Sequence, residues 1–291
     1  MVRKLNFYKD KFSINDHEIG DKSPVFIIAE IGINHNGNLH TAIDLIKTAQ
    51  KCGASSAKLQ TYITDKRVAK DNPVYEILKK CELNLSEHKE LFDLAKDLKF
   101  TLFSTPFDDE SVDLLEELHC PAYKIASFDT VNTKLLSKVS STKKPLIMST
   151  GMTNKEELKK ALSTILEKKT SNKGAELAIM HCISSYPLEE ENGNLATIKY
   201  LKKIFNGPVG FSDHSLGNLL IQYAISAGSS IVEKHFTLRR NQEGPDHSLS
   251  AEPAMLKEIV VQSKKIKKIF GEEFLGIRNS ENSAKIFRRS S

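Results

Sequence analysis

The sequence contains few cysteines, and their spacing excludes two classes of small fold. Its four cysteines lie far apart and form no CxxC or CxxH pattern; they are Cys52, Cys81, Cys120 and Cys182. Zinc ribbons and disulfide-stapled domains need closely spaced cysteines. We therefore expect free thiols in a reducing compartment.

Long apolar runs are also absent. No uninterrupted apolar segment approaches the roughly 18 residues that a membrane-spanning helix needs. Residues 1–10 are mostly polar or charged and lack the apolar centre of a secretory signal. The sequence therefore predicts a cytoplasmic protein that does not contact a membrane.

No large excess of one charge is present either. The chain has 42 Lys and Arg against 37 Asp and Glu, which gives a formal net charge of +5. Many lysines occur as pairs spread along the chain, such as Lys159-Lys160 and Lys264-Lys265, and this is typical of solvated helix faces. We therefore expect no nucleic-acid partner, whereas an anionic small-molecule substrate is compatible with the charge.

What the sequence does contain, from Pro24 onward, is a regular alternation of short apolar runs and amphipathic segments. The runs predict strands at 25–29, 57–59, 100–103, 122–126, 146–148, 177–180, 209–211 and 231–232. The amphipathic segments predict helices at 39–52, 86–98, 109–118, 133–141, 154–168, 195–205, 217–228 and 253–270. Strands this short and uniformly apolar are typical of a parallel sheet buried on both faces. Eight strand–helix units in about 250 residues favour a TIM (β/α)8 barrel over an open doubly wound sheet.

Helix starts and chain segments can also be predicted. Asn154 with Glu157 three residues later, and Ser86 before Lys89-Glu90, are typical helix starts. Residues 5–20 alternate polar and apolar, which predicts a β-hairpin that caps the N-terminal end of the barrel. We divide the chain into a hairpin extension at 1–23, a catalytic barrel at 24–275 and a C-terminal tail at 276–291.

Polar residues follow almost every predicted strand. TIM barrels build their active sites at the C-terminal ends of the strands. Lysine, glutamate or histidine stands at the ends of strands one, two, four, six, seven and eight, and hydroxyl residues stand at strands three and five. Because buried charges are costly unless they are paired, this ring predicts a site that binds charged groups.

The residue types at these ends indicate an anionic ligand. Lys58 and Lys124 would place two ammonium groups in one cavity, and backbone N–H groups near Gly151 would add donors at a helix start. The hydroxyl residues around them are Ser104, Thr105, Ser127, Ser149, Ser184 and Ser212. Such walls suit a phosphate and a carboxylate together. Alternatively, a desolvated Lys124 could form the Schiff base of an aldolase.

Two histidines, His214 and His235, end the last two predicted strands. They could hold one divalent metal between them with coordination positions left open. Ordinary hydrogen-bonded histidines would give the same pattern.

Other strand-end residues also have plain structural interpretations. His35 could shape a turn, while His181 and Cys182 could simply pack at the end of strand six. Tyr186 could be a loop wall, and Asp246 could form an Asx turn instead of accepting hydrogen bonds from a sugar.

Taken in order, the strand-end motifs resemble those of the sialic acid (nonulosonic acid) synthase family. The matching segments are Glu30–Gly37, Ser104–Phe107, Tyr123–Ile125, Ser149–Met152, Ser184–Pro187, Ser212–His214 and Glu233–Phe236. The resemblance covers residues 24 to about 270, and the motifs are specific as an ordered set.

The resemblance implies condensation of phosphoenolpyruvate with an open-chain N-acetylhexosamine, N-acetylmannosamine or a derivative, to give a nonulosonic acid and phosphate. It implies a divalent ion, Mn²⁺ first and Mg²⁺ or Co²⁺ as alternatives, on His214 and His235. It also implies a homodimer. The implied catalytic residues are Glu30, Lys58, Lys124 and Glu233. The implied substrate-binding residues are Gln60, Thr105, Ser127, Asp129, Ser149, Gly151, Ser184, Tyr186, Ser212 and Asp246.

Two departures from the family pattern bear on the substrate. Asp129 stands where many sialic acid synthases have glutamate. Family members usually continue into a small antifreeze-like (SAF) domain, and residues 276–291 correspond to the start of its linker. A Schiff-base aldolase, or an anion-binding barrel that is inactive without a second domain, are the alternatives to the synthase.

Overall fold

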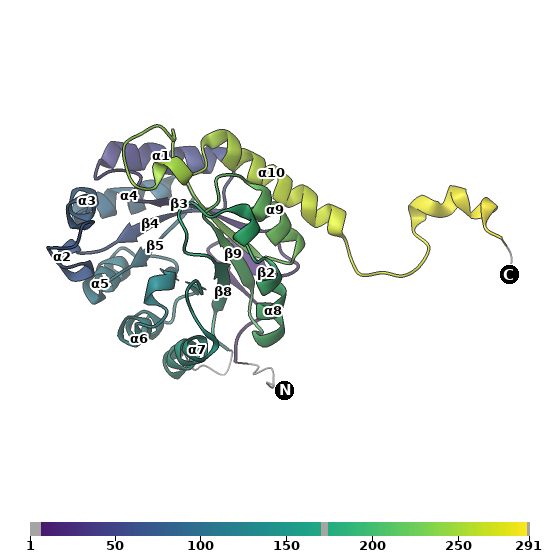
Figure 1. The fold of residues 1–291 in the computed structure, drawn as a ribbon, viewed down its shortest axis with the longest axis horizontal. Helices are drawn as coiled ribbons and strands as arrows, with labels where there is room; N and C mark the ends of the chain where they lie inside the picture. Colours follow the sequence, from purple (N-terminus) through teal and green to yellow (C-terminus); the bar gives the residue numbers. More distant parts are fainter. Residues whose placement is uncertain (1–6, 170–173, 290–291) are drawn as a thin grey trace.

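The computed structural model describes residues 7–169 and 174–289. Eight parallel strands close into a barrel in chain order from β3 to β10, with β10 paired to β3. Helices surround the strands (Figure 1). The predicted TIM barrel is therefore confirmed.

The elements lie close to their predicted positions. The barrel strands are β3 (Phe26–Gly32), β4 (Ser56–Thr61), β5 (Thr101–Pro106), β6 (Tyr123–Ile125), β7 (Leu146–Ser149), β8 (Leu177–Cys182), β9 (Val209–Asp213) and β10 (Ile231–His235). The surrounding helices are α1 (Leu39–Cys52), α4 (Leu85–Asp97), α5 (Asp109–Glu117), α6 (Thr133–Ser141), α7 (Lys155–Lys169), α8 (Ala196–Ile204), α9 (Leu219–Ser226) and α10 (Pro253–Phe270). The short 3-10 helices are η1 (Ser127–Asp129), η2 (Glu190–Asn192), η3 (His247–Leu249) and η4 (Asn279–Phe287). Several strands extend beyond the apolar runs because their polar ends continue the hydrogen-bonded ladder.

One of the two predicted helix starts is confirmed. Asn154 accepts from the Glu157 backbone N–H at 3.0 Å, and the Glu157 carboxylate accepts from the Asn154 N–H at 2.9 Å. The prediction at Ser86 is wrong. Asn84, two residues earlier, forms the same reciprocal cap with Glu87, because its amide oxygen accepts from the Glu87 N–H.

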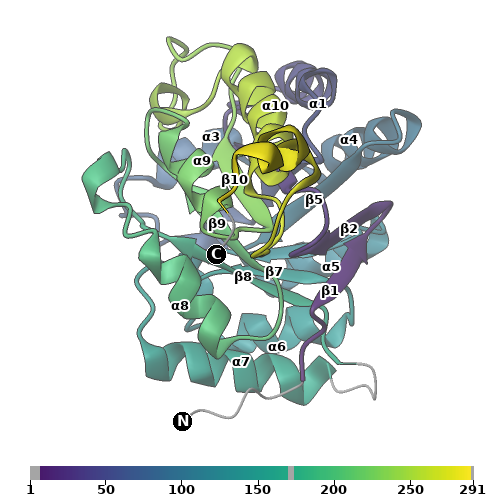
Figure 2. The ribbon, with the colours of Figure 1, turned by 90° about the vertical axis from the view of Figure 1, so that its right-hand side faces the viewer.

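The N-terminal hairpin is formed by β1 (Lys11–Ile14) and β2 (His17–Gly20) (Figure 2). Its apolar side chains are buried in one cluster with residues of β3 and β5. Asn15, in the turn, donates a hydrogen bond to Thr101 at the start of β5. The hairpin therefore covers the N-terminal end of the barrel, as predicted. Residues 5 and 6 of the predicted hairpin lie outside the described residues.

Two short helices between β4 and α4 were not predicted. They are α2 (Thr64–Arg67) and α3 (Tyr75–Cys81). They enclose a small core separate from that of the barrel, formed by Ile33, Tyr62, Leu78 and Cys81 with Val68 and Phe107 packed against it. Helices this short give weak periodicity, and tertiary contacts stabilise them.

After α10, residues 271–289 are exposed and extend away from the barrel (Figure 1). Residues 290 and 291 of the predicted tail lie outside the described residues. Across the described part of the chain, no helix is long and apolar enough to cross a membrane.

A buried ion pair links β9 and β10 on the face that packs against the helices. Lys234 Nζ lies 2.7 Å from Asp213 Oδ2 and also contacts the Ser215 carbonyl. Asp213 in turn accepts from the Ser215 N–H and hydroxyl. Lys234 is 2% exposed and Asp213 is fully buried. Removal of one partner would therefore leave an uncompensated charge in the interior.

We expect Asp213→Ala to lower the free energy of unfolding by about 3–5 kcal/mol, because Lys234 loses its counter-ion. The double variant Asp213→Ala/Lys234→Met should recover most of this loss, since it removes both charges. Urea denaturation followed by circular dichroism measures both values. A loss below about 1 kcal/mol in the single variant would show that water or another group compensates Lys234.

Candidate active site

The C-terminal ends of the barrel strands surround a small inner cavity of about 80 Å³. Twelve of the sequence-predicted site residues line it: Glu30, Lys58, Gln60, Thr105, Lys124, Ser127, Ser149, Tyr186, Ser212, His214, Glu233 and His235. Asp129 and Asp246 line an adjoining outer cavity of about 630 Å³. The structure thus brings these fourteen residues to one end of the barrel.

The remaining two predicted residues, Gly151 and Ser184, lie beside Ser127. The Gly151 N–H donates to Ser127 Oγ at 3.0 Å. A Cβ at position 151 would lie 2.7 Å from the hydroxyl oxygens of both serines. Glycine at this position therefore allows the loop after β7 to approach both hydroxyls. The Gly151 N–H, which the sequence predicted as a donor to a ligand, therefore donates to the Ser127 side chain.

Strand register places the charged residues next to one another. Glu30 of β3 is paired in register with Lys58 of β4 and with His235 of β10. Glu233 is paired with Ser212 of β9. Successive side chains of a strand point to opposite faces, so Glu233 and His235 face the interior. Lys234, between them, faces the helices.

The centre of the site is a buried cluster of two lysines and two glutamates, whose side chains are only 3–8% exposed. Lys58 Nζ lies 2.7 Å from Glu30 Oε2 and 3.9 Å from Glu233 Oε2. It also donates to Thr105 Oγ1 at 2.8 Å. The cluster is therefore anchored on both β3 and β10.

The second lysine approaches the same carboxylate from the other side. Lys124 Nζ lies 3.7 Å from Glu233 Oε1 and donates to Ser149 Oγ at 2.7 Å. Ser212 also donates to Glu233 Oε1, at 3.1 Å. Glu233 is therefore the anion shared by both ammonium groups.

The two carboxyl groups differ in protonation. Burial raises the pKa of Glu30 to about 7, although the positive charge of Lys58 opposes the rise. Burial acts in the same direction on Glu233, but Lys124 and Lys58 outweigh it and hold its pKa at about 2. Glu233 is thus a fixed anion, and Glu30 can gain or lose a proton near neutral pH. Pairs of carboxyl groups separated in this way are typical of acid–base sites.

His214 and His235 line the same cavity as the lysines, with ring centroids 5.6 Å apart. His214 Nδ1 donates to the Ile183 carbonyl at 2.8 Å; burial would lower the pKa of this ring, but its contact with the Cys182 side chain raises it above the usual value. Burial lowers the pKa of His235 to about 4, so this ring is neutral. Its Nδ1 has no hydrogen-bond partner and lies 3.7 Å from Asp246 Oδ2.

The neutral ring of His235 and its unpartnered Nδ1 fit a ligand of a divalent metal, and the His214 ring lies next to it. Metal ligation requires neutral rings with an available lone pair, and buried polar atoms without partners are uncommon. In residues 7–169 and 174–289, no group of three or more His, Cys, Asp or Glu residues is arranged to hold a metal ion. The histidine pair would therefore leave most coordination positions to substrate and water.

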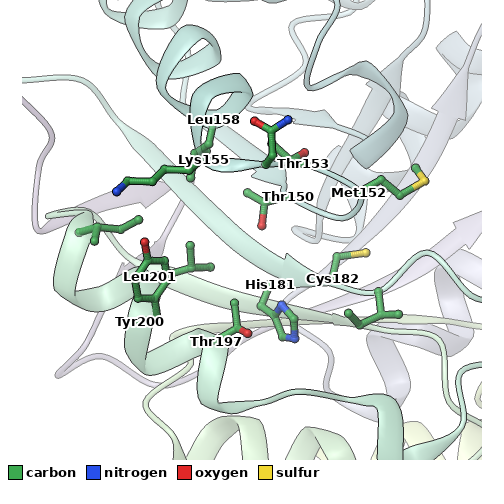
Figure 3. Close-up of a pocket in the computed structure, with 13 residues that line it drawn as sticks. Thr150, Met152, Thr153, Lys155, Leu158, His181, Cys182, Thr197, Tyr200 and Leu201 are labelled. Carbon is green, nitrogen blue, oxygen red and sulfur yellow. The ribbon is translucent and has the colours of Figure 1, made fainter.

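The plain interpretations of two other histidines are supported. The Gly37 N–H donates to His35 Nδ1 at 3.1 Å, so His35 shapes its turn. His181 Nε2 bonds the Gly193 carbonyl at 2.8 Å. Its ring lines a separate cavity of about 470 Å³ between α7 and α8, near Thr197 (Figure 3). Cys182, the next residue, differs because it also lines the inner cavity.

Tyr186 and Arg67 complete the wall between the two cavities. The Tyr186 ring lies 4.1 Å from that of His214, centroid to centroid, and burial raises the pKa of its hydroxyl. Arg67, at the end of α2, lines both cavities. Arg67 was not predicted as a site residue, because it belongs to a short helix that the sequence did not predict. Its position nine residues after the strand-end Lys58 was the only signal.

Comparisons with known proteins agree with this geometry. The NeuB family model matches residues 45–274. An uncharacterized protein of Methanocaldococcus jannaschii is 44% identical over 262 residues, which cover 90% of this chain and 77% of the relative. The N,N'-diacetyllegionaminic acid synthase of Campylobacter jejuni is 38% identical over 271 residues, which cover 88% of this chain and 80% of the relative.

A solved structure is similar over almost its whole length. It is the N-acetylneuraminic acid (sialic acid) synthetase of Leptospira borgpetersenii in complex with citrate, with a TM-score of 0.91 and 32% identity. The alignment covers 98% of both chains. The resemblance noted in the strand-end motifs therefore extends over the fold.

Gly37 fixes the loop after β3 against α3, which forms part of the outer cavity. Its φ is +73°, and a Cβ there would collide with the Lys80 carbonyl oxygen. We expect Gly37→Ala to lower the free energy of unfolding by about 2–4 kcal/mol through backbone strain and overpacking. Gly217→Ala is the control, because its Cβ would meet chiefly the flexible Glu190 side chain. Equal urea midpoints for the two variants would contradict the expectation.

Proposed function

The chain belongs to the NeuB family, and on this premise we propose that it condenses phosphoenolpyruvate with an open-chain N-acetylated amino hexose. The products would be a nonulosonic acid and phosphate. The observation that carries the proposal is the convergence of Lys58, Lys124, Glu30 and Glu233 at the base of a larger cavity. The names of the relatives, synthases of sialic and legionaminic acids, support the reaction class.

Phosphoenolpyruvate would bind in the inner cavity. Lys58 and Lys124 supply two ammonium groups there, and charge-assisted hydrogen bonds to phosphate and carboxylate are the strong ones. Nearby hydroxyls would add donors from Thr105, Ser127, Ser149 and Ser184, whereas Ser212 lines the cavity with its hydroxyl donated to Glu233. Glu233 holds both ammonium groups in place, because it faces one with each oxygen. The predicted catalytic role of the lysines is thus to bind and orient the anions.

The amino sugar would bind in the outer cavity with its aldehyde end toward Glu30. Carbon three of phosphoenolpyruvate forms the new bond to the aldehyde carbon, water adds at carbon two, and phosphate leaves. The aldehyde oxygen gains a proton in this reaction. Glu30 is suited to hold that proton, because its pKa is near the working pH. Gln60, which donates to Glu30 Oε1 at 3.3 Å, would orient this carboxyl group.

We further propose that His214 and His235 hold a divalent ion, Mn²⁺ first and Mg²⁺ or Co²⁺ as alternatives. When bound, such an ion would act as a Lewis acid on the sugar carbonyl. The unpartnered Nδ1 of His235 and the short distance between the two rings, 5.6 Å from centroid to centroid, support this assignment. Asp246, whose Oδ2 lies 3.7 Å from His235 Nδ1, would face the sugar.

The central test is phosphate release from phosphoenolpyruvate with N-acetylmannosamine, with Mn²⁺ and after EDTA. We expect release to require both sugar and metal. His214→Ala and His235→Ala should each lower kcat/KM at least about 100-fold, because each variant leaves only one of the two proposed histidine ligands. The circular dichroism spectrum should not change. His40→Ala, on the exposed side of α1, is the control.

Each contrary result of this test bears on a different part of the proposal. Full activity after EDTA, or in either histidine variant, would contradict the metal assignment. Binding of phosphoenolpyruvate without turnover with any amino sugar would favour an anion-binding barrel over the synthase.

A Schiff-base aldolase is the second candidate, because burial lowers the pKa of Lys124. Its hydrogen bond to Ser149 and its proximity to Glu233 argue against it, since both stabilise the ammonium form. We expect no covalent adduct after borohydride reduction in the presence of pyruvate, whose ketone is the group that an aldolase lysine would attack. Intact-protein mass spectrometry measures this, with Lys124→Arg as the matched control. A mass increase that disappears in this variant would support the aldolase.

A further inference from the structure

Arg67 is a half-buried cation in the wall of both cavities, and its guanidinium has few partners. It stacks on the Phe107 ring at 3.6 Å and lies 4.6 Å from the centroid of Tyr62. Among the residues that the structure describes, its one hydrogen bond runs from Nη1 to Gln60 Oε1 at 3.1 Å. No carboxylate within the described ranges forms an ion pair with it. Since a guanidinium has five N–H donors, most of them are available to a ligand.

The fold holds this side chain firmly. The start of α2 is fixed by two carboxylates, because the Ile63 N–H donates to Asp108 at 2.8 Å and the Thr64 N–H donates to Glu82 at 3.0 Å. Phe107 packs against the small core that α2 and α3 enclose. Stacking on this ring fixes the plane of the guanidinium, so its donors point along one plane into the cavity. A binding group placed in this way loses little conformational entropy when it meets a ligand.

The charges of the outer cavity argue against a phosphorylated ligand. Its lining contains two cations, Lys66 and Arg67, and two anions, Asp129 and Asp246. Lys66 is already paired with Glu110 of α5. The positive and negative side chains of this lining are therefore equal in number, and no excess positive charge is available to bind a phosphate. A neutral planar acceptor, such as an amide carbonyl, suits the donors of Arg67 better.

The rest of the lining is apolar. Val74, Ile77 and Phe128 are 45%, 42% and 61% exposed, and all three gather at the rim of this cavity. Val68 and Leu78 continue the apolar wall toward Arg67. Exposed apolar side chains that converge on one cavity are typical of a ligand-binding surface. A ligand with methyl groups beside a carbonyl matches both the apolar wall and the donor.

We propose that Arg67 is a specificity-determining residue that donates to the carbonyl oxygen of the sugar's N-acyl group, while the apolar rim holds the acyl methyl. The enzyme would thereby select N-acylated amino sugars without a phosphate. The inference rests on the proposed function and deepens it.

Steady-state kinetics with three sugars test the proposal: N-acetylmannosamine, mannosamine and N-acetylmannosamine 6-phosphate. We expect Arg67→Ala to raise the KM for N-acetylmannosamine at least tenfold and to leave the KM for phosphoenolpyruvate within twofold. The preference for N-acetylmannosamine over mannosamine should fall by a similar factor. Arg67→Lys should recover little, because an ammonium group lacks the planar donors. Arg278→Ala is the matched control, since Arg278 also stacks on a phenylalanine, in the exposed tail.

Three results would overturn the proposal. The first is an unchanged KM for N-acetylmannosamine in Arg67→Ala. The second is an equal rise in the KM for phosphoenolpyruvate, which would mean that α2 supports the inner cavity instead. The third is a wild-type preference for the 6-phosphate that disappears in Arg67→Ala, which would show that Arg67 binds a phosphate.

Calorimetric titration with N-acetylmannosamine separates this proposal from the proposed function. Binding that weakens at least tenfold in Arg67→Ala, without phosphate release by the wild type, would support the role of Arg67 and contradict the synthase. Phosphate release with equal sugar binding by both proteins would support the synthase and contradict the role of Arg67. Absence of sugar binding to the wild type would contradict the role of Arg67.

Discussion

The site depends on the burial of two ammonium groups and two carboxyl groups in the same small space. Charges this far from water are costly unless they are paired and hydrogen-bonded. Lys58 and Lys124 are satisfied by Glu30, Glu233 and the surrounding hydroxyls. The same pairing that stabilises the barrel mouth therefore preserves positive charge where an anionic substrate would bind. At the opposite end of the barrel, the apolar side chains of the hairpin pack against residues of β3 and β5.

The pleat of the strands separates functional from structural charge. On β10, Glu233 and His235 face the cavity, while Lys234 faces the helices and pairs with Asp213. The same rule distinguishes His181 from Cys182 on β8, because the His181 ring reaches the helix layer. Alternation along a single strand thus decides which polar residues can meet a substrate.

Most of the barrel and its mouth could be predicted because both follow local, repeated rules. Apolar runs and amphipathic helices alternate, and polar residues at strand ends must meet at one end of a closed barrel. The segment between β4 and α4, which contains α2 with Arg67 and α3, could not be predicted, because tertiary contacts stabilise these short helices. Ser86 and Asn84 are both suitable helix caps by residue type. Only the structure shows that the Asn84 side chain accepts from the backbone N–H of Glu87, the third residue of the helix. The use of the Gly151 N–H by Ser127 is likewise a property of loop packing.

The two cavities differ in polarity, and this difference would orient the substrate. The inner cavity is lined by the ionic cluster, whereas the rim of the outer cavity is apolar. Gln60, Arg67, Tyr186 and His235 belong to both linings, so a ligand in the outer cavity lies directly against the inner one. A sugar with a reactive carbonyl at one end and acyl methyl groups farther along can satisfy both environments in only one direction. That direction places its carbonyl beside Glu30 and His235, where the proton and the metal would act.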